Sequence, residues 1–188
     1  MLSQILQYLL EAFFGFFVFL LLLRFLMQQV KAPFQNPIGQ FVCALTDWIV
    51  VPLRRVIPPL YRIDLATILS ALLIETVLLF LLYLVRSSSL AGISGSIILF
   101  LFAVAVIKLI QYFIYLIVIA VLVSVIISWV NPHAPMAPIF YNLTRPFMRP
   151  FQRLVPPIGG FDLSPIFVVV VAQVLLIILD RVSFLIMA

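Results

Sequence analysis

The sequence predicts an all-α membrane protein in which four transmembrane helices form two parallel repeats, each a helix, a cytoplasmic interfacial amphipathic segment and a second helix. Two observations lead to this prediction. The 188 residues are 66% hydrophobic and only 9% charged, which is far too apolar for a soluble domain. A basic, proline-rich segment also occurs twice without gaps, from Thr46 to Ala66 and, 98 residues later, from Thr144 to Ser164.

Four long apolar runs provide the expected spans. A helix needs about 20 apolar residues to cross about 30 Å of hydrocarbon. Such runs cover residues 5–27, residues 65–85, part of residues 97–130, and residue 166 to the C-terminus. Because the N-terminus has no basic n-region and no small-residue cleavage site, we expect the first run to be a retained span.

The basic residues predict the orientation of these spans. The first long loop contains Lys31, Arg54, Arg55 and Arg62, and the second contains Arg145, Arg149 and Arg153. The positive-inside rule therefore places both loops in the cytoplasm and both termini in the periplasm. Four spans satisfy this arrangement, whereas a fifth span would move one arginine-rich loop to the wrong side.

The repeat divides the chain into residues 1–86 and residues 107–188, with residues 87–106 as an inserted apolar connector that contains glycine and serine. The stretch 90–107 has no counterpart in the first half. It is interpreted either as a segment on the outer surface or as the extension of a long, tilted helix. The positive-inside argument disfavours a fifth span here.

Both copies of the repeated segment show the apolar spacing of an amphipathic helix at the membrane surface. Prolines interrupt this pattern at Pro52, Pro146 and Pro150. Because proline removes a hydrogen-bond donor and clashes with the preceding turn, we expect short helical pieces with kinks. Extended turns at Pro58-Pro59 and Pro156-Pro157 should then lead into the next span.

The arginines of these segments are the candidate binding residues. They are Arg54, Arg55, Arg145, Arg149 and Arg153. The simplest role for them is to set topology and to contact headgroups. A more specific role is to bind anionic lipid or an acidic membrane-protein partner, since each basic residue near an anionic surface is worth about 1 kcal/mol. A homo-oligomer is a further expectation, and no nucleic-acid partner is predicted.

Asp64 and Asp162 occupy equivalent positions just before a span. An aspartate there accepts from the free N–H groups of the first turn and interacts favourably with the helix dipole. We therefore interpret both as helix caps. The alternative is that they bind a cation or pair with a loop arginine.

Three charged residues are expected inside the membrane, where a charge is costly and indicates function. Glu11 and Lys108 are nearly equivalent in the two repeats, so we expect a structural ion pair between them near the pseudo-two-fold axis. Glu75 is expected near the bilayer centre with no cation at its depth. It is interpreted as protonated, as paired with another subunit or as lining a polar cavity, and these three interpretations stay open.

No pattern in the sequence supports catalysis. The single cysteine, Cys43, excludes an internal disulfide and a multi-cysteine metal site. The single histidine, His133, is expected in a solvated turn. Gly92-Ile93-Ser94-Gly95 resembles the serine motif of rhomboid-type proteases but has no base beside it. We therefore predict no enzyme activity, no metal and no cofactor.

Residues in each of the two copies carry a resemblance to a known family. Those in the first copy are Asn36-Pro37, Thr46, Pro52-Leu53-Arg54-Arg55, Pro58 and Asp64. Those in the second copy are Pro150, Arg153, Pro156, Gly159-Gly160 and Asp162. With them the chain resembles the YggT family, also called YlmG, of small bacterial and plastid membrane proteins. The resemblance covers the chain except about residues 87–106, and its two-copy form resembles the proteobacterial version, which implies the inner membrane.

The resemblance implies roles rather than a site. YggT-like proteins are linked to osmotic tolerance and cation homeostasis, to organisation of the envelope or division site, and in plastid relatives to haem attachment to a b-type cytochrome. A haem-assembly role would use ligands of the client, since His133 alone cannot supply two axial histidines. We expect a non-enzymatic scaffold or assembly factor that acts through the paired arginine and proline loops. The alternative is a subunit of a potassium or osmolyte channel that uses Glu75, Glu11 and Lys108.

Overall fold

The computed structural model describes residues 1–57, 64–87, 95–154 and 162–187, and these residues form six helices and no strand. The helices are α1 Leu2–Gln29, α2 Pro37–Val56, α3 Leu65–Ser87, α4 Gly95–Val130, α5 Ala137–Leu154 and α6 Ser164–Met187. Among them α1, α3, α4 and α6 are long and apolar enough to cross a membrane. The predicted all-α fold with four spans is confirmed.

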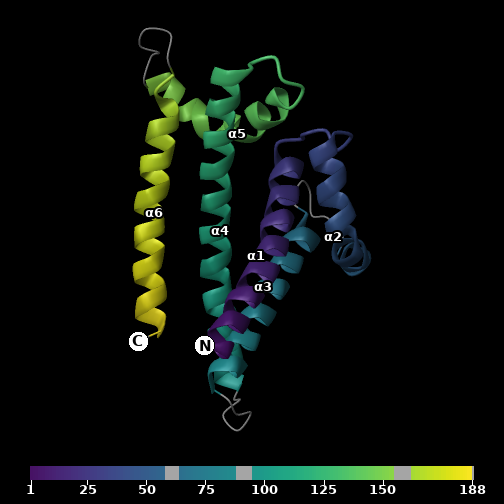
Figure 1. Cartoon of the computed structure of the whole chain (residues 1–188), viewed down its shortest axis with the longest axis vertical. Helices are drawn as coiled ribbons and strands as arrows, with labels where there is room; N and C mark the ends of the chain where they lie inside the picture. The colour runs from purple at the N-terminus through teal and green to yellow at the C-terminus, as the bar shows by residue number, and fades with distance from the viewer. Residues whose placement is uncertain (58–63, 88–94, 155–161, 188) are drawn as a thin grey trace.

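The two repeats run in the same direction through the molecule (Figure 1). α1, α2 and α3 pack together in the first repeat, and α4, α5 and α6 pack together in the second. α2 and α5 follow the upper ends of α1 and α4 in this view, whereas both chain termini lie toward the bottom. The parallel repeats therefore place the termini and the starts of the interfacial helices at opposite ends.

α4 is much longer than a membrane requires. Its 36 residues extend over about 54 Å at 1.5 Å per residue, compared with about 30 Å of hydrocarbon. Residues 95–106 form the first three turns or so of this helix. Of the interpretations of the stretch 90–107, the structure therefore supports the extension of a long helix for the part that it describes.

α4 also joins the two repeats. One side of the helix, which includes Leu116, belongs to the main core with α1, α3 and α5. On another side, Ile114 and Val118 pack against Ala172 and Leu176 of α6 in a smaller core. Helices in a membrane are held together chiefly by such van der Waals contacts, because lipid is as apolar as the side chains. The second repeat therefore has the smaller packed interior of the two.

The proline-containing segments form continuous helices, so the predicted division into short pieces is wrong. α2 continues through Pro52, and α5 continues through Pro146 and Pro150. All three prolines lie on exposed faces of their helices, where their rings do not displace a neighbouring helix. Packing of each helix on its neighbours then outweighs the lost hydrogen bonds. The turns at Pro58-Pro59 and Pro156-Pro157 lie outside the described residues.

Candidate functional site

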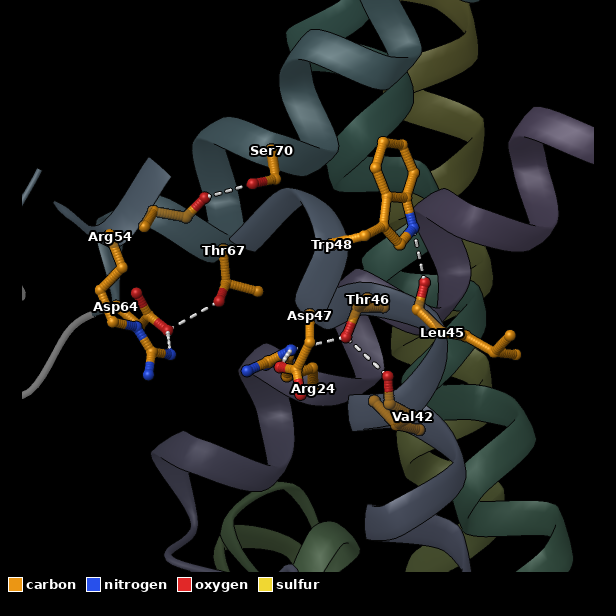
Figure 2. A network of polar contacts seen from close by, with 11 residues as sticks. Arg24, Val42, Leu45, Thr46, Asp47, Trp48, Arg54, Asp64, Thr67 and Ser70 are labelled. Atoms are coloured by element: carbon orange, nitrogen blue, oxygen red, sulfur yellow. Dashed lines mark hydrogen bonds and ion pairs between the residues drawn. The ribbon is translucent and has the colours of Figure 1, made fainter. Parts of the chain in front are cut away.

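An aspartate at the start of α3 connects this helix to α2 (Figure 2). Asp64 accepts a hydrogen bond from the Thr67 hydroxyl at 2.7 Å, and it both hydrogen-bonds and ion-pairs with Arg54 of α2. Its carbonyl oxygen accepts the backbone N–H groups of Thr67 and Ile68, which places Asp64 at the cap position. Arg54, Asp64 and Thr67 form what we call the first latch. It fixes the end of α2 to the beginning of α3.

The second repeat has an equivalent contact 98 residues later. Gln152 of α5 donates to the Asp162 carboxylate at 2.8 Å, and Asp162 accepts the backbone N–H of Ser164 at 2.8 Å. We call Gln152, Asp162 and Ser164 the second latch. Because Gln152 stands where the first repeat has Arg54, the second latch has a neutral donor. In both repeats, an aspartate thus holds an interfacial helix to the next span.

Burial acts to raise the pKa of both aspartates, but their hydrogen bonds outweigh it. For Asp64, the hydrogen bonds from Thr67 and Arg54 and the charge of Arg54 bring the pKa below its ordinary value of 3.8. For Asp162, the hydrogen bonds from Ser164 and Gln152 bring the pKa below the same value of 3.8. Both carboxylates are therefore ionised at neutral pH.

Arg24 makes a further polar contact between α1 and α2 (Figure 2). It donates to the Thr46 hydroxyl at 2.7 Å and pairs with Asp47 at 2.8 Å. The Arg24 side chain is 5% exposed, whereas that of Asp47 is 49% exposed. The sequence alone gives no signal for this contact, because nothing in the spacing of the three residues indicates that their helices meet.

The other arginines of the interfacial helices are accessible. Arg55 at the end of α2 and Arg149 and Arg153 of α5 are exposed. Arg145 is exposed too, and it lines a cavity between α4, α5 and α6. Of the five candidate binding residues, Arg54 is thus engaged in the first latch, and the other four are exposed.

Glu75 lies deep inside the first repeat and is 1% exposed. The charges of Lys108 on α4 and Glu11 on α1 both act on it, so charged residues of three helices lie within electrostatic range. Tyr112, one turn after Lys108, is in range of both glutamates. The expectation that Glu75 has no cation at its depth therefore needs correction, because Lys108 on α4 lies within electrostatic range of it, although no ion pair joins the two.

Glu11 and Lys108 do not form the predicted ion pair. In the part of the chain that the structure describes, the two ion pairs join residues near the interfacial end of the first repeat. Glu11 is exposed on α1, whereas Lys108 is half-buried. α4 packs against α3 as well as α1, so the charge of Lys108 acts on the buried Glu75 without an ion pair between them.

A polar contact between side chains also joins α4 to α6. Gln111 is 5% exposed and donates to the Asp180 carboxylate at 2.8 Å. A charged residue within an apolar span by itself indicates function. Asp180 is such a residue and can be singled out from the sequence alone. Its partner on α4 cannot be found from spacing, because it depends on how two distant helices pack.

The described residues contain no cluster of three or more His, Cys, Asp or Glu side chains that could hold a metal ion. His133 is exposed in the turn before α5, where its backbone N–H donates to the Asn131 side chain at 3.2 Å. Cys43 lies partly buried on α2. The residues Gly92-Ile93-Ser94 lie outside the described ranges.

Comparison with known proteins identifies relatives over most of the chain. The CCB3/YggT family matches it twice, over residues 3–85 and 92–183, and the second match includes most of the connector 87–106. YggT of Escherichia coli strain K12 is 34% identical over 172 residues, which cover 90% of this chain and 86% of that protein. A protein of Pseudomonas aeruginosa is 35% identical over 162 residues, or 85% of this chain and 80% of that protein. Both are named as uncharacterized proteins. No solved structure matches the chain.

Proposed function

The chain belongs to the CCB3/YggT family, and from the geometry of its two repeats we propose that it is a non-enzymatic scaffold or assembly factor of the bacterial inner membrane. In this proposal α2 and α5 lie at the cytoplasmic surface and bind anionic lipid headgroups or other membrane proteins. The proposed link to envelope or osmotic stress operates through those partners.

The pair of equivalent latches is the observation that carries this proposal. Each latch ties an interfacial helix to the next span, while Arg55, Arg149 and Arg153 stay exposed on these helices. Guanidinium groups bind phosphate and carboxylate through paired hydrogen bonds. A helix that is already held in place loses little conformational freedom on binding, which favours affinity. The arrangement suits a surface that presents arginines to acidic groups.

Charge reversal of these exposed arginines tests the proposal. The variant R55E/R149E/R153E should bind anionic phospholipid on the order of 100-fold more weakly and so lose most of it during purification in detergent, since three lost basic residues remove about 3 kcal/mol. Phospholipid per protein is measured by mass spectrometry, and partner proteins are identified by cross-linking in native membranes. R86E changes an exposed arginine at the end of α3 and serves as the control. Unchanged lipid retention together with unchanged partners would contradict the proposal.

The intramembrane charges support a second candidate function, a subunit of a potassium or osmolyte channel. Glu75 is almost fully buried and lies within electrostatic range of Lys108 and Glu11. Charged residues in a span commonly mark a pathway for ions or protons. An oligomer would be needed to surround a pore with these residues.

Potassium flux into liposomes that contain the purified protein separates the two functions. E75Q is the informative variant, because the equivalent position of the second repeat already carries a glutamine, Gln173. Flux that disappears in E75Q would replace the scaffold by a channel. Flux no higher than in empty liposomes would contradict the channel.

A further inference from the structure

A polar cavity lies between α4, α5 and α6 in the second repeat. Its volume is about 330 Å³, and its lining includes both Arg145 and Asp162. A larger cavity of about 580 Å³ shares Ser124, Ser128 and Tyr141 with it and continues toward the turn before α5. Both volumes are typical of small-molecule sites, which measure about 300–1,000 Å³.

The equivalent place in the first repeat is closed. Four residues of α1, α2 and α3 at the equivalent positions are each 0% exposed, namely Met27, Thr46, Val50 and Thr67. Their counterparts 98 residues later line the open cavity, namely Val125, Thr144, Met148 and Pro165. The same chain path therefore gives a packed interior in one repeat and a cavity in the other.

Substitution of an arginine accounts for part of this difference. In the first repeat Arg24 reaches from α1 to Thr46 and Asp47 of α2. The second repeat has Leu122 where Arg24 would be and Arg145 where Asp47 would be. The polar contact that Arg24 makes between the two helices therefore has no counterpart there, and in the described part of the chain Arg145 has no ion-pair partner.

Substitution of a threonine contributes as well. Thr67 closes the first latch by donating to Asp64, which is 7% exposed. Pro165 stands at the equivalent position and has no donor, and Asp162 is exposed. A carboxylate has about four lone-pair sites, so Asp162 can accept from a ligand while it holds the second latch.

The two charged groups define the chemistry of that ligand. A guanidinium group binds phosphate through directional hydrogen bonds, and a carboxylate accepts hydrogen bonds from a primary ammonium group. A phosphoethanolamine group carries a phosphate and a primary amine two carbons apart, so it matches both Arg145 and Asp162. A headgroup with only negative charge would be repelled by Asp162.

The apolar character of the opposite face of α5 indicates that the ligand is a lipid. An apolar groove of about 260 Å³ lies there between the same three helices, lined among others by Phe147, Phe151, Ile117 and Leu175. Helical spacing places the α5 residues of the cavity and those of the groove on different faces. α5 therefore separates a polar site from an apolar one, as expected for a helix at the boundary of headgroups and acyl chains.

We propose that the second repeat binds the phosphoethanolamine headgroup of a membrane phospholipid in this cavity, with Arg145 on the phosphate and Asp162 on the ammonium group. The site deepens the lipid-binding function proposed above, but it depends on a different arginine from the surface contact. The first repeat, closed by Arg24, is then a structural unit, and the second is the ligand-binding unit.

Trp129 lines the cavity and provides the measurement. The chain has two tryptophans, so W48F leaves Trp129 as the sole emitter. Titration of the detergent-solubilised W48F protein with short-chain phosphatidylethanolamine should change its fluorescence saturably. R145Q should weaken binding about tenfold or more, because it removes a charge-assisted hydrogen bond. S124L/S128V, which restores the residues of the first repeat and fills the cavity, should weaken it to a similar extent.

Control ligands and variants decide between the alternatives. R149Q/R153Q lies outside the cavity lining and should bind like the parent protein. Undiminished binding by both R145Q and S124L/S128V, or no saturable change at all, would overturn the site.

Equally tight binding of phosphatidylglycerol would exclude the role of the amine. Equally tight binding of glycerophosphoethanolamine, which has no acyl chains, would show that the occupant is a soluble compound. The two proposals can fail separately. If the charge-reversal variant loses anionic lipid but this titration shows no saturable binding, the site fails and the surface contact stands. If the titration succeeds but the charge-reversal variant keeps its anionic lipid, the surface contact fails and the site stands.

Discussion

Buried charges in this chain depend on residues of a neighbouring helix. Arg24 is almost fully buried, and its two partners Thr46 and Asp47 both belong to α2. Asp47 is half-exposed and remains solvated without the arginine. The pair is therefore asymmetric, because only one of its members needs the other.

This asymmetry predicts which half of the pair matters more. D47A should destabilise the protein more than R24L, because it leaves a buried cation with a single neutral acceptor. Breaking a fully buried pair costs about 3–5 kcal/mol, and the half-exposure of Asp47 places the expected loss below that range. R24L introduces the residue type that the second repeat has at Leu122. Thermal unfolding in detergent measures both changes, and a larger loss in R24L would contradict the argument.

The first latch predicts a dependence of stability on pH. The folded pKa of Asp64 is lowered below 3.8, so its ionised form stabilises the fold. That stabilisation is complete above the ordinary pKa of about 3.8 and is lost as the pH falls through the lower, folded value. The difference in melting temperature between the parent protein and D64N should therefore be constant near neutral pH and shrink below about pH 4.

Two further variants show whether this pH effect belongs to the latch. R54Q copies the pairing of Gln152 with Asp162 in the second repeat and should retain part of the effect, whereas R54A should retain less. A difference between D64N and the parent protein that grows as the pH falls would contradict a lowered pKa of Asp64 in the folded protein.

At the scale of the helix, the start of α2 is fixed by close packing. Asn36 accepts the backbone N–H of Gly39 at 2.8 Å, and Pro37 occupies the first turn. A Cβ atom on Gly39 would lie 2.7 Å from the backbone of Phe34. G39A should therefore displace the beginning of α2, at a cost of about 1–3 kcal/mol.

Gly95 provides the matched control for this substitution. A Cβ atom there would meet no atom within 4 Å, so G95A should leave the melting temperature almost unchanged. Equal melting temperatures of G39A and G95A would show that the turn before α2 adapts easily.

Some features of these helices can be predicted from the sequence, and others cannot. Apolar run length predicts the four spans, and the gapless repeat predicts that α2 and α5 correspond. Proline suggests breaks in α2 and α5 that the structure does not have, because packing of the two helices on their neighbours compensates the lost bonds. The contact of Gln111 with Asp180 and the proximity of Lys108 to Glu75 depend on helix packing. Spacing along one helix contains no information about such contacts.

At the scale of the whole molecule, the parallel repeats constrain the topology. The termini lie at one end and the starts of α2 and α5 near the other (Figure 1). Arginines are concentrated on α2 and α5, and basic residues favour the cytoplasmic side. The termini should therefore be periplasmic, and the interfacial helices should face the cytoplasm.

Labelling of single cysteines tests this orientation directly. Replacement of Cys43 by serine gives a cysteine-free chain, into which S3C places a thiol near the N-terminus and A44C places one on α2, both at exposed positions. A membrane-impermeant maleimide should label S3C in intact spheroplasts and should label A44C only after permeabilisation. Labelling of A44C but not S3C in intact spheroplasts would reverse the orientation. It would also place the arginines of α2 and α5 on the side where the positive-inside rule does not put them, and the proposed contact with cytoplasmic headgroups would then fail.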